Sequence, residues 1–268
     1  MTVAAKGVRA TATGRFRPPA VPAGAVSLLV GALGWEALGW LWQVPFFPPL
    51  SAVLGRLVEM VGEGKILGNL AQSLSDLAIG FSISVVFGIT IGVLMGAYSK
   101  VEAALGIYVN ALLTAPSLVF APVFFSMFGL SRATIVAVIV MYSIFIIIVQ
   151  TTAAMRVAPG DLLEMGRSYC APRSVLFRRI ILPAATPLIM AGVRLGMGRA
   201  VKGMINGEMF IAVVGLGKLV IDAGRRFDAE SVLAVLIVIV VVAMAAVKLV
   251  QLVDARLTSW LPSTARGA

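Results

Sequence analysis

Long apolar runs alternate with short polar segments along most of this 268-residue chain. Each run is close in length to the ~20 helical residues that cross the hydrocarbon core of a bilayer. The third run is interrupted by Pro116 and Pro122. The pattern predicts an all-α polytopic membrane protein with six transmembrane helices, at residues 24–44, 77–98, 105–128, 133–153, 184–205 and 231–252. An even number of spans places both termini on the same side.

The composition supports a membrane protein. Hydrophobic residues make up 60% of the chain and charged residues 13%, and the mean hydropathy is +1.01. Soluble domains carry about 25% charged residues. The net charge of +10 raises the question of nucleic acid. The basic residues lie between apolar runs, however, without the interleaved aromatic residues of a nucleic-acid surface, so we expect no nucleic-acid partner.

The distribution of Lys and Arg predicts the orientation. With the termini inside, the inner segments hold twelve of these residues and the outer segments six. Cytoplasmic loops carry such an excess, so we expect cytoplasmic termini. Residues 1–23 are basic and Pro-rich, which predicts a disordered cytoplasmic tail. We do not interpret them as the start of a signal peptide, because the following apolar run is too long for one. The membrane domain would then span residues 24–262, with a short C-terminal tail at 263–268.

Several kinds of chemistry are excluded by missing residues. The chain has no histidine and one cysteine, Cys170, which excludes His-based catalysis, His-ligated zinc and multi-thiolate metal sites. Gly215–Lys218 lacks the spacing of a phosphate-binding loop. We therefore expect that this chain is not an enzyme, binds no cofactor of its own and hydrolyses no ATP.

The connector between the first two spans is too polar to cross a membrane. Apolar residues recur at helical spacing from Leu50 to Val61, which predicts an amphipathic helix on the outer face. A docking surface and a packed connector are both open for it.

The longest inner loop, residues 156–183, has two short helical pieces. Asp161 to Tyr169 predicts one helix, and Pro172 opens a second that ends near Pro183. Such a loop can present a rigid knob to a partner below the membrane. It can also lie flat on the lipid surface, held there by its arginines.

The residues of this loop resemble a known pattern. Glu164 to Arg173 and Phe177 to Pro183 are similar to the "EAA" loop of binding-protein-dependent ABC importer permeases. The sequence departs from the pattern at three positions, where Met165 and Gly166 replace two alanines and Cys170 replaces a glycine. A glycine there allows a positive φ between the two short helices. The resemblance assigns contact with an ATPase to Glu164, Met165, Gly166, Ser168, Cys170, Ala171, Leu182 and Pro183.

Further segments between Leu28 and Leu261 look like the nitrate, sulfonate, taurine and bicarbonate branch of that family, among them Leu113–Ser117, Ala191–Leu195 and Gly207–Met209. The resemblance implies the type I ABC importer permease fold in a bacterial inner membrane. It also implies a second permease copy, a cytoplasmic ATPase dimer that binds ATP and Mg, and an extracytoplasmic solute-binding protein. The loop would be the coupling helix.

Ionisable residues within spans are candidates for a solute path. Arg194, Arg199 and Lys202 fall on one half of the fifth span, and Glu208 follows. Arg199 and Lys202 favour a small anionic solute. The cations can instead snorkel to the interface or neutralise acidic groups, and Glu208 can be a structural partner of a cation.

Prolines at membrane depth are tolerated where protein or a water cavity surrounds them. Pro116, Ser117, Phe120 and Phe124 are therefore further candidates for lining the path. Ordinary helix packing is the alternative for this segment.

Two other classes of function compete with the importer subunit. A stand-alone secondary transporter or channel would need no coupling loop, and usually shows internal repeats or acidic relays. A membrane anchor or assembly factor would move no solute. Neighbouring genes for an ATPase and a secreted binding protein would separate the three.

Overall fold

The computed structural model describes residues 23–42, 44–157, 160–211 and 213–259, and all regular structure in these ranges is helical. The predicted tails at 1–23 and 263–268 lie outside the described residues except for Ala23. In chain order the elements are α1 (Ala23–Trp42), α2 (Leu50–Gly62), α3 (Lys65–Ala97), α4 (Ser99–Thr114), the short helix η1 (Ser117–Phe120), α5 (Ala121–Phe128), α6 (Arg132–Ala154), α7 (Gly160–Ser168), α8 (Arg173–Leu176), the π-helical turn η2 (Phe177–Ile181), α9 (Leu182–Ile211), α10 (Gly215–Arg225) and α11 (Ala229–Leu257).

The described residues hold five helices that are long and apolar enough to span a membrane, namely α1, α3, α6, α9 and α11. A sixth span arises if α4 is joined to η1 and α5, which are bent from it by 99°. The predicted third span is therefore not a continuous helix. The break falls at Ala115–Pro116, where proline removes a backbone donor and holds the preceding residue in extended backbone.

The described residues up to Ser51 form a unit of their own. In it the Trp35 indole N–H donates to the Pro48 carbonyl at 3.1 Å. The Glu36 carboxylate accepts from the Ser51 N–H at 2.9 Å and from the Ser51 hydroxyl at 2.8 Å, which caps the first turn of α2. Gly39 makes room for Pro49 at this corner, because a methyl group on Gly39 would come within 2.5 Å of the Pro49 Cα.

The described residues from Ala52 onward form the second unit, in which α6 packs between α3 and α9. Helices α3 and α6 run parallel. Small residues that recur every four positions on α3 therefore face residues that recur at the same spacing on α6. Gly80 faces Ile139, Gly88 faces Ile147 and Gly92 faces Thr151. Between them the Ser143 hydroxyl donates to Ser84 Oγ at 2.8 Å. Small residues at such spacing bring helix backbones close together in membranes.

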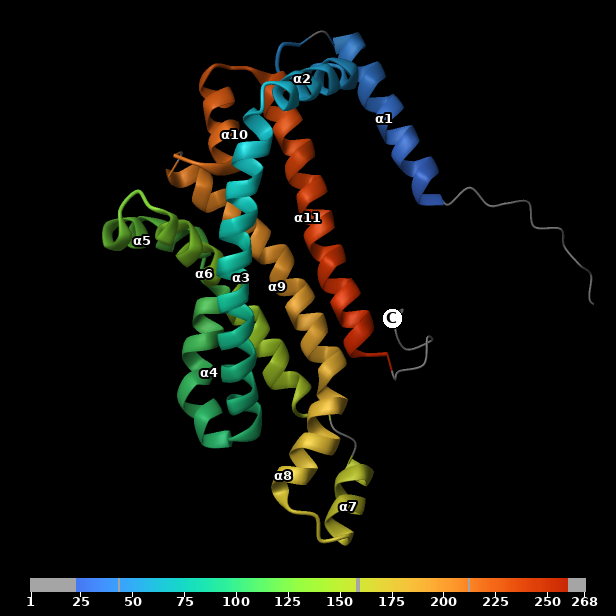
Figure 1. Cartoon of the computed structure of the whole chain (residues 1–268), viewed down its shortest axis with the longest axis vertical. Helices are drawn as coiled ribbons and strands as arrows, with labels where there is room; N and C mark the ends of the chain where they lie inside the picture. The colour runs from blue at the N-terminus through green and yellow to red at the C-terminus, as the bar shows by residue number, and fades with distance from the viewer. Residues whose placement is uncertain (1–22, 43, 158–159, 212, 260–268) are drawn as a thin grey trace, which may run out of the picture. The chain divides into compact units, whose positions relative to one another are not determined.

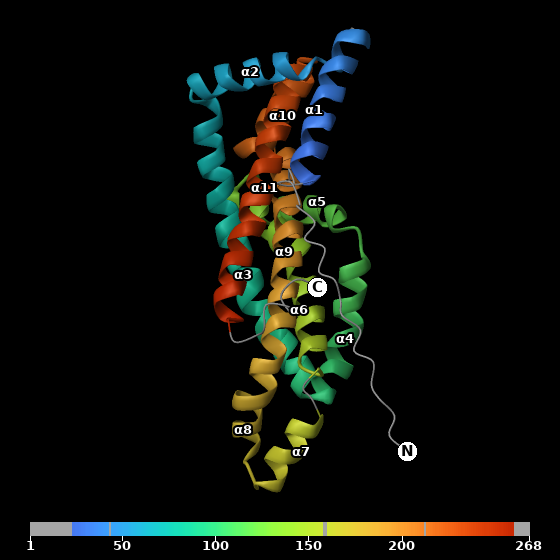
Figure 2. The same cartoon turned by 90° about the vertical axis from the view of Figure 1, so that its right-hand side faces the viewer.

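Helix α9 runs antiparallel to α6, with Gly192 opposite Gln150 and Gly207 opposite Ile135. Within this second unit, α10 lies at one end of the helices and α7 with α8 lies at the other (Figures 1 and 2).

Two predicted boundaries differ from the ends of the helices. Helix α3 begins at Lys65 rather than near residue 77, because the polar residues of its first turns have partners: Ser73 Oγ accepts from the Leu216 N–H at 2.9 Å, and Asp76 pairs with Arg132. The second short helix of the inner loop does not end near Pro183. It continues through η2 into α9, so residues 173–211 form one continuous helical segment.

Candidate functional site

Helices α7 and α8 form a hairpin whose turn contains Cys170. The Ala171 N–H donates to the Gly166 carbonyl at 3.0 Å and the Cys170 N–H donates to the Arg167 carbonyl at 2.8 Å. These are the two bonds of a Schellman ending, which requires a left-handed residue after the helix. Cys170 takes φ 52 there. The backbone conformation that the family glycine permits is therefore adopted by a cysteine.

The two arms of the hairpin touch at Gly166. This residue is buried, and a methyl group on it would come within 2.4 Å of Leu176 Cδ2 and 3.2 Å of Ile180 Cδ1. Leu176 is itself 8% exposed. The small residue at this position thus allows α8 and η2 to lie against α7, so the hairpin is packed as one body.

Most of the predicted loop residues lie on the outside of this hairpin. Glu164, Met165, Ser168 and Cys170 are exposed, and Ala171 is half-buried. The neighbouring Tyr169 is 82% exposed, which places an accessible aromatic ring at the turn. The Ser168 hydroxyl donates to the Glu164 carbonyl at 3.0 Å, so it serves the helix backbone. The remaining two predicted residues, Leu182 and Pro183, lie in the first turn of α9.

The π-helical turn η2 joins the hairpin to α9. The Leu182 N–H donates to the Phe177 carbonyl, five residues earlier. Pro183 has no N–H, and in a regular α-helix its ring would clash with the carbonyl four residues before it. A wider turn directly before the proline lets the helix continue past it. The hairpin is therefore connected to α9 by helix rather than by a flexible linker.

Helix α9 carries cations on its outer face. Arg199 and Lys202 are exposed, and neither forms an ion pair within the described part of the chain. Arg194 differs from them, because its guanidinium pairs with Asp254 on α11. Within the described ranges, two of the three cations of this span thus lack the acidic partner that would assign them a structural role.

Glu208 is fully buried and does not share this outer face. Its Oε2 accepts from the Gly217 N–H at 2.8 Å, at the start of α10. Gly215, with φ +87, lies so close that a methyl group on it would come within 2.2 Å of the carboxylate carbon. The predicted path residue therefore caps α10. Its partner is a backbone N–H group, and no cation pairs with it among the described residues.

The predicted residues around the break after α4 lie at the surface of this unit. Pro116 is exposed, while Ser117, Phe120 and Phe124 are half-buried. Helix α5 reaches α9 through an edge-to-face contact between the Phe125 and Phe210 rings, whose centroids are 6.4 Å apart.

One polar pair between α6 and α9 escaped sequence reasoning. The Asn206 side-chain amide donates to the Tyr142 hydroxyl at 2.8 Å. Tyr142 lies near the middle of α6, and its ring lies against Gly203, whose added methyl group would come within 2.9 Å of Tyr142 Cβ. A single tyrosine in an apolar run has no sequence signal. The glycine three residues before Asn206 is the only hint of a close neighbour.

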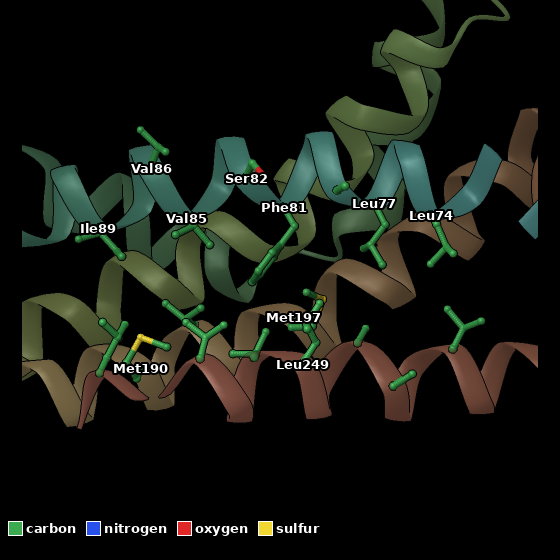
Figure 3. Close-up of a pocket in the computed structure, with 18 of the residues that line it drawn as sticks. Leu74, Leu77, Phe81, Ser82, Val85, Val86, Ile89, Met190, Met197 and Leu249 are labelled. Carbon is green, nitrogen blue, oxygen red and sulfur yellow. The ribbon is translucent and has the colours of Figure 1, made fainter. Parts of the chain in front are cut away.

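A groove of about 970 Å³ lies between α3, α9 and α11 (Figure 3). Phe81 and Leu77 of α3 face Met197 and Leu249 across it. Ser82 is the one hydroxyl among otherwise apolar lining side chains. A polar solute would lose its hydration there without gaining hydrogen bonds, so this groove is not the site for a small anion.

Comparison with known proteins places the chain in a family. The model of the family described as "Binding-protein-dependent transport system inner membrane component" matches residues 84–259. The nitrate import permease protein NrtB of Synechocystis sp. is 31% identical over 64% of this chain and 62% of its own length. The taurine transport system permease protein TauC of Escherichia coli is 26% identical over 88% of this chain and 90% of its own length.

Solved structures share the fold. The crystal structure of an amino acid ABC transporter with histidines matches with a TM-score of 0.62 and 17% sequence identity, covering 75% of this chain and 98% of that chain. At this identity the likeness concerns the fold alone. The predicted resemblance to ABC importer permeases, in the branch that includes nitrate and taurine transport, is confirmed.

Proposed function

Because this chain belongs to the family of binding-protein-dependent transport system inner membrane components, we propose that it couples solute import to a cytoplasmic ATPase through residues 164–183. In this proposal two copies of the chain form a translocation path for a small anionic solute. The ATPase dimer binds ATP and Mg, and an extracytoplasmic binding protein delivers the solute. The protein is a multi-pass component of a bacterial inner membrane with its termini in the cytoplasm.

The continuity of the hairpin with α9 carries the coupling part of the proposal. Leu176 packs on Gly166, and η2 continues into α9 without a break. A partner that moves the exposed face of α7 therefore moves α9 as well, because no flexible joint lies between them. Coupling between distant sites needs such an element with two arrangements, each favoured by a different ligand.

The cations of α9 support an anionic solute. Arg199 lies one helical turn from Lys202, and both are exposed without ion pairs in the described residues. A charged side chain at membrane depth is costly unless it faces protein or water. An interface between two copies that holds water and anions would satisfy both residues. The relatives named for nitrate and taurine support the same class of solute.

The experiment that tests the coupling measures ATP hydrolysis by the whole transporter in proteoliposomes. The chain is reconstituted with the ATPase and the binding protein encoded by neighbouring genes, and Glu164→Ala is compared with wild type. We expect the stimulation by loaded binding protein to fall about tenfold, within the range of coupling free energies between sites. Glu230→Ala is the matched control, because Glu230 is also exposed but lies in the first turn of α11.

Two results would overturn the proposal. The first is that loaded binding protein stimulates ATP hydrolysis by the Glu164→Ala complex as much as by wild type, while the loop can be shortened without loss of assembly. The second is that the chain recruits no ATPase and still moves solute, which would identify a stand-alone secondary transporter.

A further inference from the structure

The pair formed by Tyr142 and Asn206 places polar groups between two apolar spans. Tyr142 lies near the middle of α6 and Asn206 in the second half of α9, and both are half-buried. Gly203 makes room for the tyrosine ring, since any side chain there would meet Tyr142 Cβ and the Ile139 backbone. The fold therefore holds the tyrosine hydroxyl at a fixed position against α9.

This pair has more hydrogen-bond donors than it uses. The asparagine amide carries two N–H hydrogens and the tyrosine hydroxyl one O–H hydrogen. The bond between Asn206 Nδ2 and the Tyr142 hydroxyl uses one of the three. No other partner of these side chains occurs among the described residues. Two donors remain for a ligand, and unused donors at membrane depth are costly unless a ligand or water accepts from them.

A positive charge lies beside these donors. Lys202 precedes Asn206 by four residues, so the two side chains are neighbours on the surface of α9. The nearest acidic residue of this helix, Glu208, is fully buried and bound to the start of α10. The surface near Tyr142 thus combines N–H and O–H donors with a cation, and an oxygen-rich anion accepts from all of them.

We infer that Tyr142, Asn206 and Lys202 form a subsite for the oxoanion group of the solute, in which the Tyr142 hydroxyl donates a hydrogen bond to a solute oxygen. This inference rests on the proposed function, because it assumes that α9 lines the path. The solute class is a nitrate-like or sulfonate-like oxoanion, whose oxygens accept hydrogen bonds from the hydroxyl and the amide while Lys202 compensates the charge.

The test measures uptake of labelled nitrate and labelled taurine by the complete transporter in proteoliposomes. Tyr142→Phe removes one oxygen atom and keeps the ring against Gly203. We expect its rate of uptake for the better of the two probes to fall about tenfold, the effect of losing one hydrogen bond to a charged group. ATP hydrolysis without binding protein should stay at the wild-type rate. The matched control is Tyr108→Phe on α4, where the side chain is 65% exposed, and we expect wild-type uptake for it.

A second variant keeps the inference falsifiable if Tyr142→Phe assembles poorly. Asn206→Asp can still bond to the Tyr142 hydroxyl, but it consumes that O–H and adds a negative charge beside Lys202. We expect normal assembly and a loss of anion uptake of at least tenfold. Wild-type anion uptake by either Tyr142→Phe or Asn206→Asp overturns the subsite and leaves the proposed function intact. A wild-type transporter that takes up neither anion overturns the subsite together with the proposed anionic solute, and leaves the coupling to the ATPase to its own test.

Discussion

Arg132 at the start of α6 pairs with Asp76 of α3, with its Nη2 2.6 Å and its Nε 2.8 Å from Asp76 Oδ1. The Asp76 side chain is fully buried, whereas the Arg132 side chain is 51% exposed. The carboxylate therefore depends on this arginine for its charge compensation, while the arginine retains access to its surroundings. The pair joins α3, about three turns after its start, to the first turn of the parallel helix α6 in the second unit.

Removal of the buried partner should destabilise the protein. For Asp76→Ala we expect a loss of about 2 kcal/mol, because a hydrogen bond to a charged group contributes ~1.5–3 kcal/mol and the half-exposed arginine can partly recover its solvation. The measurement is reversible unfolding in a mild detergent. Asp161→Ala, at an exposed position in the first turn of α7, should change stability by less than about 0.5 kcal/mol. Equal effects of the two variants would contradict this account.

The close contact between α3 and α6 predicts a strong difference between two glycines. A methyl group at Gly92 would come within 2.5 Å of Thr151 Cβ and 2.8 Å of the Ile148 carbonyl, neither of which can move alone. We expect Gly92→Ala to cost about 1–3 kcal/mol through overpacking. Gly198 in α9 has no such neighbour within 4 Å, so Gly198→Ala should stabilise the helix by about 1 kcal/mol. Thermal unfolding of both variants in one detergent tests the order.

The cysteine at the hairpin turn should be suboptimal for stability. Non-glycine residues in the left-handed region are strained by about 1 kcal/mol, and a β-branched residue is worse. Cys170→Gly should therefore slow proteolytic cleavage within residues 160–176, whereas Cys170→Val should accelerate it. Both changes replace the thiol, so a shared effect in the same direction would point to thiol chemistry instead of backbone strain.

The start of α11 should respond to acid. Burial raises the pKa of Asp228. The hydrogen bonds from the Ser231 hydroxyl and N–H and the charge of Arg56 together lower this pKa by more than burial raises it, so the pKa lies below its usual value. Asp228 lies outside the membrane-spanning segments, directly before α11. Its stabilisation is complete above the ordinary pKa of 3.8 and is lost as the pH falls through the lower folded value.

Asp228→Asn isolates this effect, because asparagine also caps helices but does not titrate. Between about pH 5 and about pH 2 we expect the unfolding midpoint of wild type to fall more steeply than that of Asp228→Asn. Parallel curves for the two proteins would show that Asp228 contributes nothing to the pH dependence.

The hydropathy pattern predicts α6 well, because buried polar residues of this helix such as Ser143 and Thr152 are hydroxyl residues that donate to carbonyls of their own helix. Helix α6 begins and ends within one residue of its predicted span. The hydropathy pattern fails to predict the start of a helix where buried polar residues have partners from elsewhere in the chain. The pattern therefore does not predict the first turns of α3. Their polar residues Ser73 and Asp76 gain their partners, the Leu216 N–H and Arg132, only in the folded protein.

The sequence likewise predicts only part of the candidate functional site. The loop motif places the turn between the two short helices at Cys170. Such a turn requires a positive φ, and Cys170 has φ 52. The place of Glu208 could not be predicted locally, because its partner Gly217 lies in a helix that the hydropathy pattern does not distinguish. The Tyr142–Asn206 pair depends on the register between α6 and α9, which periodicity does not contain.

The charge on the outer face of α9 gives the last prediction. Lys202 and Lys248 are both exposed lysines within apolar spans, on α9 and α11 respectively. If α9 lines the path for an anion, Lys202→Gln removes an attractive charge from the path, while Lys248→Gln removes one from a different helix. We expect nitrate uptake to fall about tenfold or more in Lys202→Gln, as for loss of a charged hydrogen bond, and to stay near wild type in Lys248→Gln. A wild-type rate in Lys202→Gln would contradict the path along α9, because a cation within reach of a passing anion cannot be neutral to its passage. Equal losses in both variants would contradict it too, because a general need for basic residues in the spans would then explain the effect without any path.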